Sequence, residues 1–239
     1  MMFRASLSPH VIPPVAGGKT ISHNTWIHKV ARLTVTKPLM ATGSRITPSQ
    51  VTVVRMATGI AAAAAFSIGP SPWLDLPWWQ IGAVLFILSM VLDRGDGDYA
   101  RQSGQTSAAG HKFDLIADAV CNAIIFVGLG IGLRGGEWGM LAIPMGVLAG
   151  ASVTFILWMV MRMESLAGAR SAELGSFMGF DPDDAILVAP IMVLLGYQEA
   201  LLVAATIGAP GFALLFAVQW GIKYRARRRA LAEGGKPEE

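Results

Sequence analysis

The chain has 239 residues, of which 53% are hydrophobic and only 15% are charged, and its mean hydropathy is +0.51. A soluble domain carries about 25% charged residues, so this composition excludes an ordinary soluble protein and favours one helical bundle in a membrane. The net charge is +3, and its single cysteine, Cys121, cannot form a disulfide within the chain. Cys121 lies in an apolar block and is expected to pack as a small side chain.

The first 46 residues form a basic arm, in which the segment from Trp26 to Met40 alternates cationic and apolar residues. This alternation predicts an amphipathic helix lying in the membrane interface, with a disordered arm as the alternative. Pro48 then marks the start of the first apolar span.

Apolar blocks separated by short polar joints predict six transmembrane helices over residues 47–224, followed by a basic tail over residues 225–239 that is expected to be disordered. The second and fifth blocks are short and are expected to extend into the polar residues that flank them. The blocks run from about Val51 to Ile68, Trp78 to Leu92, Phe113 to Leu133, Trp138 to Met161, Ala185 to Gly196 and Leu201 to Ile222.

Positive charges fall on one side of this expected bundle. Lysines and arginines occupy the arm, the joints after the second and fourth spans, and the tail, whereas the opposite side carries only Arg134. Cationic segments stay in the cytoplasm, so both termini are expected there. The predicted location is the inner (cytoplasmic) membrane, which the chain crosses several times.

Four aspartates occur where a membrane protein should be apolar: Asp93 and Asp96 after the second block, and Asp114 and Asp118 at the start of the third. An isolated carboxylate inside a bilayer costs at least about 2.5–3.5 kcal/mol. Residues three or four apart share a helix face. The two helices are expected to pack antiparallel, so that their acidic faces meet in one pocket near the cytoplasmic surface.

Carboxylates crowded into one pocket repel one another unless a divalent cation neutralises them. Hard oxygen ligands suit Mg²⁺, Mn²⁺ or Ca²⁺, and such clusters are typical of phosphoryl transfer. Asp118 lies deepest and is the natural general base. Small residues at Gly97, Ala100 and Gly110 allow a ligand to approach the backbone, and Arg101 offers donors for a phosphate or a base edge.

The spacing of these residues resembles the signature of the CDP-alcohol phosphotransferase family, Asp-x2-Asp-Gly-x2-Ala-Arg-x8-Gly-x3-Asp-x3-Asp. The segment Thr47-Pro48-Ser49-Gln50-Val51-Thr52 also looks like the family's Thr-Pro-Asn-x-x-Thr start of the first helix, with Ser49 in place of asparagine. Every fixed position of the signature is filled here, by Asp93, Asp96, Gly97, Ala100, Arg101, Gly110, Asp114 and Asp118.

The resemblance implies six helices and a homodimer, and it implies a role for each signature residue. The acceptor hydroxyl would attack the phosphorus distal to cytidine and CMP would leave, with Asp118 as the catalytic base. Mg²⁺ or Mn²⁺ would be held by Asp93, Asp96 and Asp114, with Asp118 also near the metal. The nucleotide would be bound by Asp93, Gly97, Ala100, Arg101 and Gly110.

Other polar residues near the expected pocket are candidates for acceptor binding: Lys112, Asn122, Arg162 and Arg170. Their cations modestly favour a phosphorylated acceptor, although interfacial charge and helix–helix hydrogen bonding explain such residues equally well. Arg55, inside the first span, is expected to snorkel or to pair within the bundle.

Several functions stay open at this point. The favoured one is a phospholipid-biosynthetic transferase that uses a CDP-linked donor, with CDP-diacylglycerol preferred, an alcohol acceptor and membrane lipids as its partners, and no nucleic acid. A CDP-amino-alcohol acting on a lipid hydroxyl is the alternative donor. A cation transporter, a membrane prenyltransferase and a non-enzymatic scaffold are the competing classes.

Overall fold

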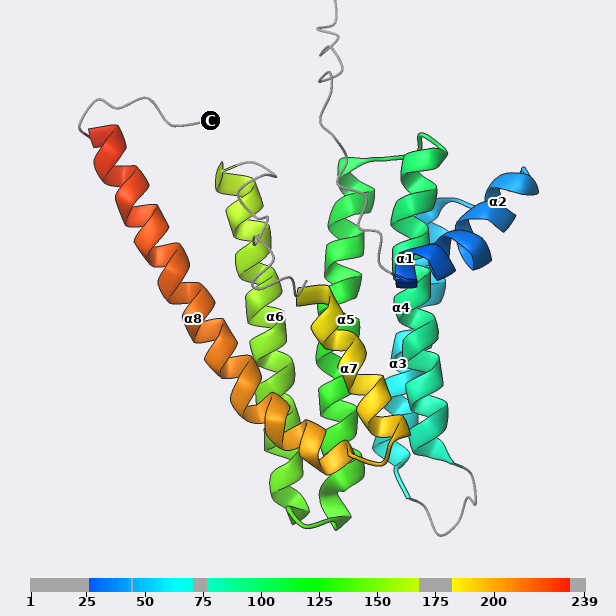
Figure 1. Ribbon diagram of the computed structural model, residues 1–239, viewed down its shortest axis with the longest axis vertical. Coiled ribbons are helices and arrows are strands. Elements are labelled where there is room, and N and C mark those ends of the chain that lie inside the picture. The colour runs from blue at the N-terminus through cyan, green and yellow to red at the C-terminus, as the bar shows by residue number, and fades with distance from the viewer. Residues whose placement is uncertain (1–25, 44, 71–76, 168–181, 233–239) are drawn as a thin grey trace, which may run out of the picture.

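The computed structural model describes residues 26–43, 45–70, 77–167 and 182–232 (Figure 1). Every regular element within these ranges is a helix, which confirms the expected all-α class. In chain order the elements are α1 (Trp26–Ala31), the π-helical η1 (Arg32–Thr36), α2 (Lys37–Ala41), α3 (Pro48–Ile68), α4 (Trp78–Gln102), α5 (Ala108–Gly132), the 3-10 turns η2 (Leu133–Gly135) and η3 (Gly139–Leu141), α6 (Ala142–Ala167), α7 (Pro182–Leu194) and α8 (Gln198–Ala232).

Four segments of the described chain are long and apolar enough to cross a membrane, and they correspond to the first, third, fourth and sixth expected spans: Pro48–Ile68, Ala108–Gly135, Gly139–Met159 and Gln198–Ile222. The second expected span lies in α4, which continues through charged residues to Gln102. The fifth lies in α7, whose 13 residues extend about 20 Å at the usual helical rise. Six spans therefore remain a prediction.

The starts of α3 and α5 are fixed by side-chain caps. At α3, the Thr47 hydroxyl accepts a hydrogen bond from the Gln50 backbone N–H at 3.4 Å, and the Gln50 side chain accepts one from the Thr47 N–H at 2.8 Å. Pro48 occupies the first helical position, where no donor is needed. At α5, the Ser107 hydroxyl accepts from the Gly110 N–H at 3.0 Å. These caps set where the two helices begin on the acidic side of the bundle.

The helices α4 and α5 run antiparallel, as expected (Figure 1). Each packs closely against α3, whereas α4 and α5 make few backbone contacts with each other. All three helices come together at Gly59 of α3. A Cβ built there would lie 2.7 Å from Cys121 Sγ of α5 and 3.2 Å from Ser89 Oγ of α4. Gly128 of α5 likewise lies against the Ala63 carbonyl of α3, as small residues commonly do between membrane helices.

The connection between α4 and α5 lies at the same end of the bundle as the C-terminal ends of α6 and α8 (Figure 1). Below it, large apolar side chains from several helices are fully buried together, and they form the core on which the acidic end rests: Phe66, Phe86, Ile125, Leu129 and Leu202.

The N-terminal segment α1–η1–α2 is helical, as predicted, and packs on the side of α4. The Thr36 hydroxyl donates to the Gly95 carbonyl at 3.4 Å, and Val35 lies over Gly95. Nε of Arg32 lies 3.3 Å from Oδ2 of Asp98. The segment is thus attached to the acidic end of α4, while its position at a membrane interface remains a prediction.

We expect Gly95→Ala to destabilise the protein, because the added Cβ would lie 2.7 Å from Cβ and Cγ1 of Val35. Overpacking of this kind costs about 1–3 kcal/mol. Gly208→Ala in α8 is the matched control, since nothing lies within 4 Å of the added Cβ. That variant should be neutral or slightly stabilised. Thermal midpoints in detergent micelles compare the two, and equal midpoints would contradict the described packing of η1 on α4.

Candidate active site

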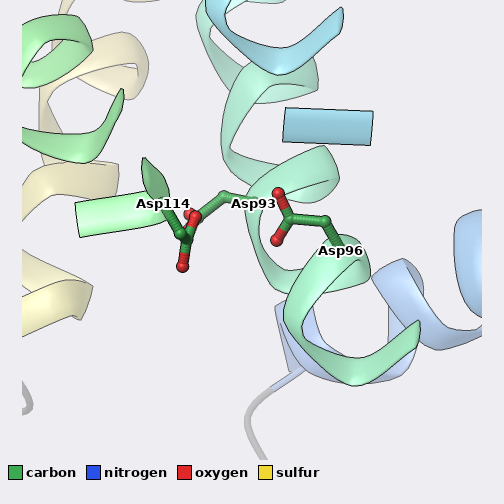
Figure 2. A group of neighbouring side chains, drawn as sticks. All are labelled: Asp93, Asp96 and Asp114. Atoms are coloured by element: carbon green, nitrogen blue, oxygen red, sulfur yellow. The ribbon is translucent and has the colours of Figure 1, made fainter. Parts of the chain in front are cut away.

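Three carboxylates converge at the acidic end of the bundle. Asp93 and Asp96 extend from the last turns of α4 and Asp114 extends from the first turns of α5, and their side chains approach one another (Figure 2). One oxygen atom from each lies within 4.8 Å of the others. The proximity predicted from the spacing is thus confirmed for these three residues.

Asp96 is the most buried of the three, with only 2% of its surface exposed. Its Oδ2 atom accepts a hydrogen bond of 2.7 Å from the hydroxyl of Thr52 on α3. Its Oδ1 atom is buried and has no hydrogen-bond partner. A buried acceptor without a donor is costly, and a hard divalent cation bound by this oxygen atom would remove that cost. The residues present therefore fit Mg²⁺ or Mn²⁺.

Arg55 of α3 places its guanidinium in the middle of the acidic residues, and its side chain is only 3% exposed. Nη1 lies 2.7 Å from Oδ1 of Asp93 and 3.0 Å from Oδ1 of Asp114. Nη2 donates to Oδ1 of Asp118. Arg55 is thus paired within the bundle, and one arginine connects three of the four aspartates.

Arg55 and Thr52 were missed as site residues by reasoning from the sequence. The available signal was their spacing: the two residues are three apart, share one face of α3, and include the one basic residue between Val51 and Ile68. A charge inside an apolar span requires a partner. The acidic stretch that follows in the chain supplies that partner.

Asp118 lies one turn deeper in the bundle than Asp114 and borders a cavity. The Nδ2 atom of Asn122, a further turn along α5, donates to Oδ1 of Asp118 at 3.3 Å. The cavity has a volume of about 50 Å³, and α3, α4, α5 and α7 all contribute to its lining, whose polar residues are Arg55, Ser89, Asp93, Arg94, Asp118 and Asn122. A polar group of a small ligand can therefore reach Asp118 from this cavity.

Four of the residues expected to bind the nucleotide lie nearer to the α4–α5 connection than the aspartates, and they are not among the residues that line the cavity. Gly97 and Ala100 are half-buried in the last turns of α4. A Cβ at Gly97 would find only the Arg101 guanidinium near it, at 3.5 Å. The Arg101 side chain is 61% exposed, with Nη2 3.8 Å from Oδ1 of Asp98. Gly110 lies in the first turn of α5. These positions leave backbone accessible beside the carboxylates.

The candidate acceptor residues are less closely grouped. Asn122 contacts Asp118, as described above. Lys112 is exposed in the first turns of α5, and Arg162 is exposed near the C-terminal end of α6. Arg170 lies outside the described residues. Asn122 is joined to Asp118 by a hydrogen bond, and the other acceptor assignments remain predictions.

A helical bundle with several membrane-length apolar helices and an acidic cluster at one end defines a class of membrane protein suited to cation-dependent chemistry on phosphates. Residues 45–210 match the CDP-alcohol phosphatidyltransferase family, and the chain therefore belongs to that family. The predicted resemblance is confirmed. No curated protein matches the chain. Membership supports a transferase that takes a phospho-alcohol group from a CDP-alcohol, in a family that typically depends on divalent metal.

Proposed function

We propose that the protein transfers a phosphatidyl or another phospho-alcohol group from a CDP-linked donor to the hydroxyl of an alcohol, with release of CMP. The proposed donor is CDP-diacylglycerol. The observation that carries this proposal is the approach of Asp93, Asp96 and Asp114 to within 4.8 Å, with Asp118 beside them on α5. The alternative donor of the same class is a CDP-amino-alcohol used against a lipid hydroxyl.

The proposed metal ligands are Asp93, Asp96 and Asp114, with Mg²⁺ or Mn²⁺ as the ion. Bound there, such an ion would neutralise the donor diphosphate and stabilise the charge that develops on the departing CMP. Around it, Gly97, Ala100, Arg101 and Gly110 would receive the nucleotide, because they leave backbone and guanidinium donors open beside the carboxylates.

The proposed general base is Asp118. The acceptor hydroxyl attacks the phosphorus distal to cytidine, its proton passes to the Asp118 carboxylate, and the bond between this phosphorus and the CMP oxygen breaks. The cavity beside Asp118 supports this role, because an acceptor could enter it. Asn122 would hold the carboxylate in position through its 3.3 Å hydrogen bond. Lys112, Arg162 and Arg170 are proposed to attract a phosphorylated acceptor.

The proposed setting is the cytoplasmic membrane. We propose that α4 and α7 complete six spans, that both termini and the acidic end face the cytoplasm, and that the chain forms a homodimer. The distribution of lysine and arginine supports this orientation, because the end that carries the motif also carries most of the basic residues. The helix α1–η1–α2 would lie along the same cytoplasmic surface.

A CMP-release assay tests the proposed reaction. Purified protein in mixed micelles is given Mg²⁺ or Mn²⁺, one of several CDP-linked donors and one of several alcohols. We expect CMP to appear only when donor, alcohol and divalent ion are all present, and EDTA to stop the reaction. Release of no CMP from any pair would contradict the proposal. Metal uptake into vesicles without any need for a cytidine nucleotide would favour the cation transporter instead.

A further inference from the structure

The guanidinium of Arg55 contacts the same carboxylates that the proposed function assigns to a metal ion. Nη1 lies 2.7 Å from Asp93 and 3.0 Å from Asp114, while Nη2 donates to Asp118. Asp96, by contrast, accepts a hydrogen bond from the Thr52 hydroxyl. One side chain therefore touches two of the three proposed ligands and the proposed base at the same time.

The position of the Arg55 guanidinium affects how strongly the four carboxylates repel one another. Four carboxylates in a largely buried place repel one another, and a single guanidinium compensates only part of their charge. Arg55 cannot lose its proton under ordinary conditions, so it is a permanent cation. A divalent ion that takes the Oδ1 atoms of Asp93 and Asp114 competes with Nη1 for them. Asp118 is held by a different nitrogen, so this contact can persist when the other two are lost.

We propose that Arg55 is a built-in counter-ion and positioning residue: it holds Asp93 and Asp114 in the metal-free protein, competes with the divalent ion for them, and retains Asp118 when the ion binds. The inference rests on the metal role proposed above. Its consequence is that the acidic end remains assembled without metal, and that the affinity for metal is lower than the carboxylates alone would give.

The test compares Arg55→Gln with Arg94→Gln in the full-length protein in detergent micelles. Arg94 is the matched control, because its Nη1 atom lies 3.2 Å from Oδ2 of Asp93, whereas Arg55 contacts Oδ1 of the same carboxylate. Binding of Mn²⁺ alone is measured by the electron paramagnetic resonance signal of the free ion, and thermal midpoints are recorded in EDTA and in saturating Mn²⁺. None of these measurements requires turnover.

We expect Arg55→Gln to bind Mn²⁺ roughly ten-fold more tightly or better, because a competing cation next to the ligands is gone. Its midpoint in EDTA should fall below that of the wild type, and the gain on adding Mn²⁺ should widen. Arg94→Gln should change the affinity by less than about three-fold. Unchanged or weaker Mn²⁺ binding in Arg55→Gln, or an equal effect of Arg94→Gln, would overturn the inference.

Arg55→Lys provides the second variant if Arg55→Gln does not fold. Lysine keeps the charge but lacks the fork that reaches both sides of the site. We expect its Mn²⁺ affinity to exceed that of the wild type, and unchanged affinity would overturn the inference. The two proposals fail differently. Wild-type protein that releases CMP in EDTA would remove the metal role itself, whereas Mn²⁺ binding that is indifferent to residue 55 would remove only the role of Arg55.

Discussion

Replacing Asp118 with asparagine should lower the rate of CMP release by about 10²–10⁴-fold, the usual contribution of a general base. The amide has nearly the same shape as the carboxylate, and its oxygen can still accept the hydrogen bond that Arg55 Nη2 donates in the wild type. What is lost is the capacity to take a proton from the acceptor hydroxyl. The expected pattern is therefore slow turnover with most of the nucleotide affinity retained.

Asp98→Asn is the matched control for this experiment. Asp98 belongs to the same acidic stretch, but it faces away from the cluster, with its Oδ2 atom 3.3 Å from Arg32 Nε and 2.9 Å from Gln102 Nε2. The turnover of Asp98→Asn should stay within a few-fold of that of the wild type. Normal turnover by Asp118→Asn, with donor and acceptor both saturating, would show that the proton goes elsewhere and would end the assignment of Asp118 as the base.

The second large effect is expected at Asp93, where alanine should abolish the metal-dependent part of nucleotide binding. Asp93 supplies one of the three grouped oxygens and is only 13% exposed in its side chain. Without Asp93, Nη1 of Arg55 would keep its contact with Asp114 and lose its contact with Asp93. A metal site deprived of one carboxylate holds a divalent ion weakly, and the donor diphosphate then loses the positive charge that would anchor it.

Titration calorimetry with CMP or a CDP-linked donor, with and without Mg²⁺, measures this effect. The wild type should bind the nucleotide more tightly with Mg²⁺ than in EDTA, and Asp93→Ala should show the weak EDTA value under both conditions. Asp98→Ala, which removes a carboxylate outside the cluster, should behave like the wild type. If Asp93→Ala kept the full response to Mg²⁺, Asp93 would no longer be a candidate ligand.

The positions of the helices followed from local patterns, which is why most of them were predicted well. The first span was expected from Val51 and begins at Pro48, because Thr47 caps the helix four residues before the apolar run. The second apolar block ends near Leu92 and was expected to extend into the polar residues beyond it, and α4 does continue to Gln102. The motif residues form its last turns, as the spacing of Asp93 and Asp96 on one face requires.

The arrangement around the acidic cluster could not be predicted in the same way. Spacing within α4 and within α5 shows which residues share a face, but it contains no information about the helix on which both of them pack. The proximity of Asp96 and Asp114 therefore followed from the sequence, whereas the bridging position of Arg55 did not. Thr52 lies in the segment that looks like the family's start of the first helix, but neither its contact with Asp96 nor the contact of Arg32 with Asp98 was predicted, since each pair joins segments far apart in the chain.

Both halves of the motif pack on α3, which makes this helix their common support. At Gly59, the hydroxyl of Ser89 on α4 and the thiol of Cys121 on α5 approach the same point on this helix, so a larger residue there would push α4 and α5 outward. Mg²⁺ requires oxygen atoms at about 2.0–2.1 Å and Ca²⁺ accepts about 2.3–2.6 Å. Discrimination between ions by size would then be governed from a glycine that touches neither the ion nor its ligands.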